Sequence, residues 1–330
     1  MTVSRGPLPE TAAILELRRA VRGWLAERGA DEVAVALSGG ADSLALCVAA
    51  VAEAGAVRAI VVDHRLQPGS DEVAEAAAGA ARTLGVADAV VVAVDARSGT
   101  GGPEAAARAA RYRALDEHRG NAPVLLAHTL DDQAETMLLG LARGSGGRSI
   151  QGMRAWDAPW GRPLLGVRRA TTRAACTDLG LSPHEDPHNS DPAFTRVRVR
   201  RDVLPVLEAA LGTHVPIALA RTAAQLQDDG DALDAVAAAT ADRVLGHEDL
   251  DATLLAPEPA AIRRRVLRTW LVREGATAPT DTQLRAVDAL VADWRGQGPV
   301  AVGGGRPDAR LVVIRRRGKL MIGQDDRRRV

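Results

Sequence analysis

The hexapeptide Ser38–Ser43, with the sequence SGGADS, restricts the fold of this chain more than any other feature. It follows the apolar run 33–37, which predicts a buried strand, and it precedes a stretch over 44–54 that favours a helix. A glycine-containing turn before a helix binds anions well, because free backbone N–H groups and the positive end of the helix dipole face the ligand. The hexapeptide therefore predicts a phosphate-binding loop at the end of the first strand.

The glycines alone would also fit an ordinary strand-to-helix turn, where they only allow the backbone conformation. Asp42 is the residue that distinguishes this loop from such a turn. A carboxylate repels phosphate unless a cation lies between them, so Asp42 predicts a bridging Mg²⁺ or a carboxylate that orients other groups. The pattern G-x-x-x-x-G-K-[ST] does not occur in the chain, which excludes a Walker-type loop.

Composition limits the class of protein. A chain of 330 residues is long enough for two domains, and its 42 basic and 42 acidic residues give no overall charge that would indicate nucleic acid or a membrane. The segment 306–330 is locally basic, with eight arginines and one lysine against three aspartates, and either a phosphate backbone or plain solvent suits it. Two distant cysteines favour a reducing compartment, and we expect a cytoplasmic protein.

Apolar runs at 33–37, 59–63, 89–95 and 124–128 alternate with alanine-rich stretches of helical character. This alternation predicts an α/β fold with a doubly wound parallel sheet, preceded by an amphipathic helix over 14–28. Ligands of such sheets bind at the carboxyl ends of the strands. We therefore expect the loop, Asp63–His64 and His128–Asp132 to meet in one crevice.

The chain changes character after the helix predicted over 204–211, because residues 212–214 form a break before a long helix over 217–245. We predict a catalytic domain over 1–212 and a smaller, mostly helical domain over 213–330. Two short apolar runs, 311–314 and 320–322, flank the basic segment 315–319. They predict that the second domain ends in a basic β-hairpin.

Asp132 and Glu135 lie three residues apart at a predicted helix start, so both carboxylates share one face. Such a pair can bind a cationic group or a metal ion. It can equally cap the helix, since acidic residues in the first turn complement the dipole.

Four further strings accompany the hexapeptide in order: VVDHRLQPGS (61–70), PEAAARAARYRAL (103–115), LLAHTLDDQAETMLLGLARGSG (125–146) and EDPHNSDPAFTRVRVRRDVLP (185–205). Together they resemble the tRNA(Ile)-lysidine synthetase family within the PP-loop ATP pyrophosphatases. The resemblance covers roughly residues 30–210 and implies an adenine-nucleotide hydrolase-like, Rossmann-like fold.

The resemblance implies a two-step reaction on an isoleucine tRNA with a CAU anticodon. The C2 oxygen of the wobble cytidine attacks the α-phosphate of ATP, and pyrophosphate leaves. The ε-amine of free lysine then attacks C2, which releases AMP and leaves lysidine. ATP and Mg²⁺ are thus the implied co-substrate and metal, and tRNA and lysine the implied partners; the sequence leaves open whether the chain forms a homodimer.

The resemblance also assigns roles to residues, which we state as expectations. ATP is expected to contact Ser38, Gly39, Gly40, Ala41, Asp42, Ser43, Asp63 and His64, with Mg²⁺ on Asp42. Lysine is expected to contact His128, Asp132 and Glu135, and the expected catalytic residues are these three with Asp42 and Arg108. The expected tRNA contacts are Arg111, Arg143, Arg148, Arg196, Arg198, Arg200, Arg201, Arg315, Arg316, Arg317 and Lys319.

For two sets of these arginines, the spacing in the sequence also indicates that the side chains share one face. Glu104, Arg108 and Arg111 lie on one helix face, where Arg108 can reach a phosphate or simply pair with Glu104. Arg196, Arg198 and Arg200 alternate, so on an extended segment they would share one face.

Three other functions compete with this one. A tRNA thiolase of the same superfamily needs reactive or cluster-binding cysteines, and the chain has no C-x-x-C. A synthetase that forms amides on a small molecule would not need the arginine-rich stretch 196–201 or the basic tail. A nucleotide-sensing RNA-binding module without turnover would not need Asp42, Asp132 and Glu135.

Overall fold

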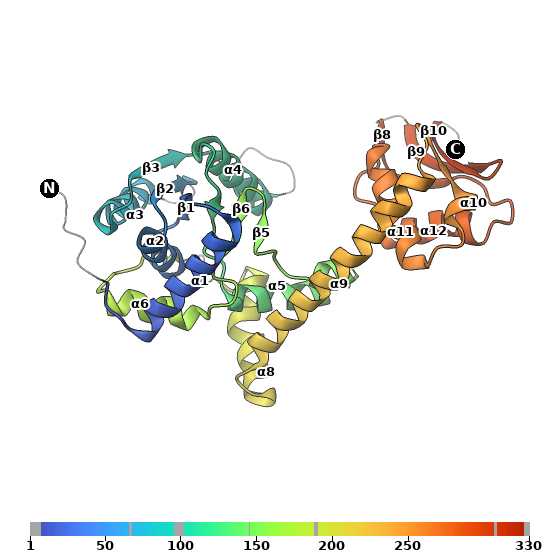
Figure 1. Cartoon of the computed structure of the whole chain (residues 1–330). Helices are drawn as coiled ribbons and strands as arrows, with labels where there is room; N and C mark the ends of the chain where they lie inside the picture. The colour runs from blue at the N-terminus through green and yellow to red at the C-terminus, as the bar shows by residue number, and fades with distance from the viewer. Residues whose placement is uncertain are drawn as a thin grey trace. The chain divides into compact units, whose positions relative to one another are not determined.

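The computed structural model describes residues 8–65, 68–95, 102–144, 146–187, 191–306 and 309–326. The chain divides into two compact units (Figure 1). The first unit comprises the chain up to Arg143 together with 150–223, and the second comprises 144–149 and the chain from Ala224 onward. The division falls inside helix α9 (Val215–Val244), whereas the sequence places the domain boundary between 212 and 213.

A six-stranded sheet forms the centre of the first unit. Its strands are β1 (Glu32–Leu37), β2 (Ala56–Asp63), β3 (Asp88–Ala93), β4 (Val124–Leu125), β5 (Trp156–Asp157) and β6 (Trp160–Gly161). They lie in the order β3-β2-β1-β4-β6-β5, and every neighbouring pair is parallel except β5 with β6. The predicted doubly wound parallel sheet is confirmed, with β1 at its centre.

Helices cover the two faces of this sheet (Figure 1). They are α1 (Ala12–Arg28), α2 (Ala41–Glu53), α3 (Ser70–Leu84), α4 (Pro103–His118) and α6 (Arg169–Asp178). Helix α5 (Leu130–Arg143) packs instead against the segment around Val199 and Leu204. Alternate residues of β1 serve opposite faces. Val35 and Leu37 pack toward α1, α2, α3 and α6, while Ala34 and Ala36 pack toward Leu115 of α4.

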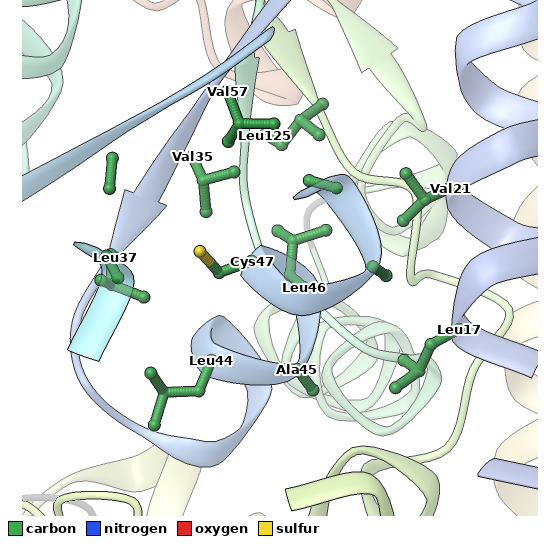
Figure 2. Packing of buried hydrophobic residues seen from close by; sticks show 14 of the residues in the cluster. Leu17, Val21, Val35, Leu37, Leu44, Ala45, Leu46, Cys47, Val57 and Leu125 are labelled. Atoms are coloured by element: carbon green, nitrogen blue, oxygen red, sulfur yellow. The ribbon is translucent and has the colours of Figure 1, made fainter. Parts of the chain in front are cut away.

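Figure 2 shows the larger of these two cores around α2. Leu44, Leu46 and Cys47 of α2 lie between the sheet and α1, and α2 is buried over eight successive positions. A helix that is apolar on nearly every side is held by packing alone. The start of α2, and with it the predicted phosphate loop, is therefore fixed by the core.

The segment after the sheet corrects one expectation. Residues 196–200 are not extended: they belong to α7 (Thr195–Arg198) and to a π-helical turn, η3 (Val199–Val203), which continue into α8 (Leu204–Leu211). The physical reason is burial, because Val199 and Leu204 pack on Ala134 of α5. Arg196 and Arg200, four residues apart on a helix, share a face that excludes Arg198.

The second unit has more sheet than the sequence indicates. It contains α10 (Ala252–Leu255), α11 (Ala260–Arg273) and α12 (Asp281–Ala292), and a sheet with the order β7-β10-β9-β8. These strands are β7 (Asp249–Asp251), β8 (Val300–Arg306), β9 (Ala309–Arg316) and β10 (Lys319–Asp326). The predicted hairpin is confirmed as β9–β10, but it is longer than expected and belongs to a four-stranded antiparallel sheet around the buried Trp270.

A short stretch, η1 (Gly147–Ile150), adopts a 3₁₀ helix. Within the described residues, no single helix combines the length and apolar character needed to cross a bilayer, although the bent pair Thr195–Leu211 and Val215–Val244 meets those two criteria when taken together.

Gly161 tests how tightly the first core is packed. A β-carbon on this residue would overlap the Trp24 ring and lie 2.9 Å from Cδ2 of Leu125. Overpacking of a rigid ring typically costs about 1–3 kcal/mol. We expect Gly161→Ala to lower the free energy of unfolding by that amount in urea titrations, while Gly166→Ala, where no atom lies within 4 Å, leaves it nearly unchanged. Equal stability of the two variants would contradict this packing.

Candidate active site

The loop at the tip of β1 is organised by its own serines. The Ser43 hydroxyl donates to the Gly40 carbonyl (2.9 Å) and accepts from the backbone N–H of Ser38 (3.2 Å). Gly39 has φ of +80°, a left-handed conformation that favours glycine, and its carbonyl accepts from the His184 N–H (3.0 Å). Gly40 is the N-cap of α2. The N–H groups of the first turn of α2 therefore remain available to an anion.

A cavity of about 550 Å³ adjoins this loop at the carboxyl end of the sheet. Ser38 and Gly40 line one side, Asp63 and His64 at the end of β2 line another, and residues 184–187 close it. The volume is in the range of pockets for small organic ligands and cofactors. The predicted convergence of the loop with Asp63–His64 is present in the structure.

A larger hollow of about 970 Å³ lies at the opposite, amino ends of the strands. Four of its charged groups pair with each other, Arg58 with Asp88 (3.2 Å) and Arg28 with Glu27 (2.6 Å). Ligands of open parallel sheets bind at the carboxyl ends. The smaller cavity beside the loop is therefore the candidate ligand site.

Arg111 and His64 give this cavity its polar character. Burial lowers the pKa of the Arg111 guanidinium, which nonetheless stays charged at neutral pH. Burial, reinforced by Arg111, lowers the pKa of His64, and the His64 Nδ1 is buried without a partner among the described residues. A half-buried cation and an unpaired ring nitrogen suit a polyanionic ligand with polar edges.

An ionic cluster lies next to the loop and joins three helices. Arg169 at the start of α6 contacts Asp132 (2.7 Å) and Glu135 (3.1 Å) of α5 and Asp42 (3.6 Å) of α2. Thr172, one turn along α6, donates its hydroxyl to Asp42. The Asp42–Asp132–Glu135 set that the sequence singles out is thus brought together through Arg169.

Two more arginines complete this cluster. Arg200 contacts Glu135 (2.7 Å) and Asp132 (3.5 Å), and Arg196 reaches Glu135 at 4.0 Å and donates to the Thr136 hydroxyl (3.2 Å). The Glu135 side chain is 0% exposed. A fully buried carboxylate is stable only with such partners.

Asp132 serves the helix and the cluster at once. Its Oδ2 accepts from the backbone N–H and the hydroxyl of Thr129 (both 2.8 Å), and Thr129 directly precedes α5. Burial alone would raise the pKa of Asp132, but Arg169 and the Thr129 hydrogen bonds outweigh burial and lower it. The helix-capping interpretation of Asp132 and its place in a charged site therefore both hold.

The pKa of Asp42 moves in the opposite direction. Burial raises it, although the Thr172 hydrogen bond and Arg169 partly offset the effect.

His128 lies beside the same cluster, and burial lowers its pKa to about 3, with Asp132 opposing and Arg162 reinforcing the shift. The His128 ring is therefore neutral at physiological pH, and its buried Nδ1 has no partner within the described part of the chain.

Several arginines expected at the site lie elsewhere. Arg108 stacks on Tyr112, with its Cζ 4.9 Å from the ring centre, and does not line the cavity; the Glu104 side chain lies outside the described residues. Arg111, expected on tRNA, lines the cavity beside the loop. Arg198 donates to the carbonyls of Pro192 and Ala193, and Arg143 and Arg201 have partners of their own.

In the second unit, the expected tRNA contacts divide into paired and unpaired groups. Arg148 pairs with Asp234 (2.6 Å), and Lys319 pairs with Asp249 (2.8 Å). Arg315 donates to the carbonyls of Leu290 and Val291 at the end of α12. Arg316 and Arg317 are exposed at the hairpin turn.

Arg169 and Thr172 are the site residues that the sequence analysis missed. A signal for Arg169 exists, because a cation at a helix N-terminus opposes the helix dipole and needs a compensating anion. The pair Arg168–Arg169 breaks that preference at the start of α6. Arg168 binds Asp131 (3.1 Å) and Glu208 (3.4 Å), and Arg169 binds the cluster.

Both cysteines are unsuited to sulfur chemistry. Burial raises the pKa of Cys47 to about 12, and burial together with Asp42 raises that of Cys176 to about 11. A thiol with such a pKa is not a thiolate at neutral pH. The tRNA thiolase alternative therefore has no reactive cysteine to use.

A glycine-containing loop at the tip of the central parallel strand, with a cavity beside it at the carboxyl end of the sheet, is typical of ATP-binding proteins of the PP-loop class. The family model described as "PP-loop domain" matches residues 14–207, and "TilS substrate binding domain" matches 250–321.

Relatives of nearly equal length identify the family. The tRNA(Ile)-lysidine synthase of Rhodococcus jostii (strain RHA1) is 64% identical over 98% of this chain and 99% of its own length. That of Mycobacterium tuberculosis (strain ATCC 25618 / H37Rv) is 52% identical over 89% of this chain and 92% of its own. The chain belongs to the tRNA(Ile)-lysidine synthase family, and as such it is a ligase that uses ATP as co-substrate.

Among solved structures, the U34-tRNA thiolase NcsA from Methanococcus maripaludis, with its [4Fe-4S] cluster, is similar with a TM-score of 0.55 and 19% identity. The match covers 66% of this chain and 81% of the thiolase. At that identity the likeness concerns the fold alone, and it supports the α/β architecture.

The low pKa of His128 can be measured directly. We expect its ring resonances not to titrate between about pH 5 and 8 in NMR spectra, with assignment by loss of the signal in His128→Gln. The pKa in the folded chain lies below the ordinary value of about 6.5, so the unfolded chain takes up the proton first as the pH falls. His128 should therefore destabilise the fold below about pH 6.5, by up to about 1.4 kcal/mol per pH unit. A titration midpoint near the ordinary value would contradict this environment.

Proposed function

We propose that this chain attaches the ε-amine of lysine to C2 of the wobble cytidine in an isoleucine tRNA with a CAU anticodon. The observation that carries the proposal is Asp42, because it belongs both to the phosphate loop and to the cluster that contains Asp132 and Glu135. One residue thus joins a site for ATP to a site for a cationic amino acid. The substrate-binding family model over 250–321 supports tRNA as the larger substrate.

In the proposed first step, the cytidine C2 oxygen attacks the α-phosphorus of ATP and pyrophosphate leaves. The backbone N–H groups at the start of α2 face the departing phosphates and stabilise the charge that develops on them. Arg111 adds a half-buried positive charge from α4. His64, at the edge of the cavity, offers a neutral ring nitrogen to the nucleotide.

Mg²⁺ belongs to this proposal through Asp42. The described residues contain no group of three or more acidic, histidine or cysteine side chains that could hold a metal without help. Magnesium in nucleotide sites characteristically binds one or two carboxylates together with substrate phosphates, so a single carboxylate at the loop fits. The ion would offset phosphate charge when bound.

In the proposed second step, the lysine ε-amine attacks C2 and AMP leaves. Asp132 and Glu135 bind the ammonium group, and one carboxylate accepts a proton so that the neutral amine can attack. The neutral ring of His128 is a hydrogen-bond partner beside them, not a base, because its pKa is about 3.

We place this reaction in the cytoplasm, where tRNA, ATP and free lysine occur together. Whether the chain works as a homodimer is decided by sedimentation of the purified protein. The activity itself is tested by incubation with the tRNA transcript, ATP and radiolabelled lysine, followed by nucleoside analysis. A transcript with uridine at the wobble position should remain unmodified, and absence of labelled lysidine from the cytidine transcript would overturn the proposal.

Asp42→Ala and Glu135→Gln should separate the two steps. Asp42→Ala should reduce tRNA-dependent release of pyrophosphate at least 100-fold, because the loop loses its carboxylate. Glu135→Gln should keep pyrophosphate release but accumulate adenylated tRNA, because the lysine subsite loses a charge. The control is Glu208→Gln, which removes a carboxylate that contacts Arg168 but not Arg169. Unchanged lysine kinetics in Glu135→Gln would remove Glu135 from the lysine subsite.

Arg316 and Arg317 are the second unit's clearest candidates for phosphate contacts, because neither has a partner within the described residues. The double variant Arg316→Gln/Arg317→Asn should weaken tRNA binding and reduce the slope of log affinity against log salt by about 1–2, with ATP binding intact. Arg285→Gln, which removes an arginine paired with Asp281, is the control. A salt slope equal to that of the unaltered chain would make the turn structural only.

A further inference from the structure

Arg169 holds the two carboxylates that the proposed function reserves for lysine. Its two terminal nitrogens contact Asp132 Oδ1 (2.7 Å) and Glu135 Oε1 (3.1 Å), which is how an ammonium group between these carboxylates would bind. Arg169 is only 16% exposed and Glu135 is fully buried, so solvent screens these contacts little. A bound lysine and Arg169 in this position therefore compete for the same oxygens.

The charges of the cluster balance without a substrate. Asp42, Asp132 and Glu135 supply three negative charges, and Arg169, Arg200 and Arg196 supply three positive charges. Addition of a lysine ammonium would leave a net positive charge in a poorly solvated place, which is unfavourable. Lysine thus binds well only if one of the arginines takes another anionic partner.

Arg169 is the arginine that has such a partner within reach. Its Nε lies 3.6 Å from Asp42 Oδ2, and Thr172 of the same helix donates to Asp42, so the start of α6 borders the phosphate loop. Among the described ion pairs, Arg200 contacts Asp132 and Glu135, and Arg196 contacts Glu135. Neither is paired with Asp42, on which Arg200 acts only from a greater distance. A triphosphate at the loop would place strong acceptors beside Arg169, and a guanidinium matches phosphate geometry.

We propose that Arg169 is a positioning residue that couples the two substrates: it competes with lysine for Asp132 and Glu135, and a nucleotide at the loop draws it away. This inference rests on the proposed assignment of lysine to those carboxylates. It makes lysine binding conditional on ATP. Because coupling between two ligands is reciprocal, lysine must tighten nucleotide binding by the same factor.

The unaltered chain tests the coupling without any substitution. Lysine affinity is measured by equilibrium dialysis with radiolabelled lysine, with and without saturating α,β-methylene ATP. The adenylyl group of this analogue cannot be transferred to tRNA, because a methylene group replaces the oxygen between the α- and β-phosphates. We expect the analogue to tighten lysine binding about 10-fold or more, within the usual range of coupling between sites. An affinity that does not depend on the analogue would overturn the proposal.

The variant Arg169→Gln distinguishes competition between Arg169 and lysine from a role of Arg169 in merely stabilising the site. If Arg169 competes with lysine, the variant should bind lysine more tightly than the unaltered chain when no nucleotide is present, and the effect of the analogue should shrink at least 3-fold. A residue that merely supports the site would give the opposite result, weaker lysine binding in both conditions, and that result would overturn the proposal. Arg168→Gln is the matched control, because this neighbour contacts Asp131 and Glu208 instead, and its coupling should equal that of the unaltered chain.

The outcomes separate this inference from the proposed function. Thermal melting of both variants shows that they fold, and if Arg169→Gln does not fold, the measurement on the unaltered chain still decides. Suppose that Glu135→Gln abolishes lysine binding, while the analogue and Arg169→Gln leave it unchanged. That result would leave the proposed function intact and remove the coupling. Lysine binding that is undetectable in every condition, together with no labelled lysidine, would remove the proposed function itself.

Discussion

The packing of α2 against the centre of the parallel sheet is the constraint on which the rest of this structure depends. The helix has almost no polar face, so its position follows from the fit of Leu44, Leu46 and Cys47 between β1 and α1. That fit determines where the helix begins, and the beginning of the helix is the phosphate loop. The loop geometry that we propose for an anion is therefore maintained by apolar contacts outside the loop.

Charge compensation is the second principle of the site. Three carboxylates from two helices would repel one another in so poorly solvated a place, and Arg169 and Arg200 make their proximity stable. The cost is that the carboxylates already have partners. Under the proposed function, a substrate cation must displace one of these arginines. Selectivity for the amino acid would then depend on how well its ammonium group and chain length reproduce the contacts of the displaced guanidinium.

Much of this site was predictable because its signals are local. The strand, glycine turn and helix around Ser38–Ser43 follow from the order of residue types, and the strand ends at Asp63 and His128 follow from the topology of parallel sheets. Arg169 was not predictable in the same way, because its partners lie 34 or more residues away in the chain. Its only local signal is a cation where the helix dipole disfavours one.

The failed expectation for residues 196–200 has a different cause. Alternating arginine and valine predicts an extended strand, yet Val199 packs with Leu204 on α5, and this tertiary contact holds the segment as helix. The second unit was underestimated for a similar reason: β8 is rich in glycine and carries little strand propensity of its own, and pairing with β9 stabilises it.

The double duty of Asp132 has a consequence for how this enzyme family can change. The carboxylate that we propose for the cationic substrate also closes the first turn of α5 through Thr129. A mutation that altered amino-acid preference at this position would also loosen the helix that presents its neighbours. A change of amine preference at this position would therefore need a second change that keeps the first turn of α5 closed.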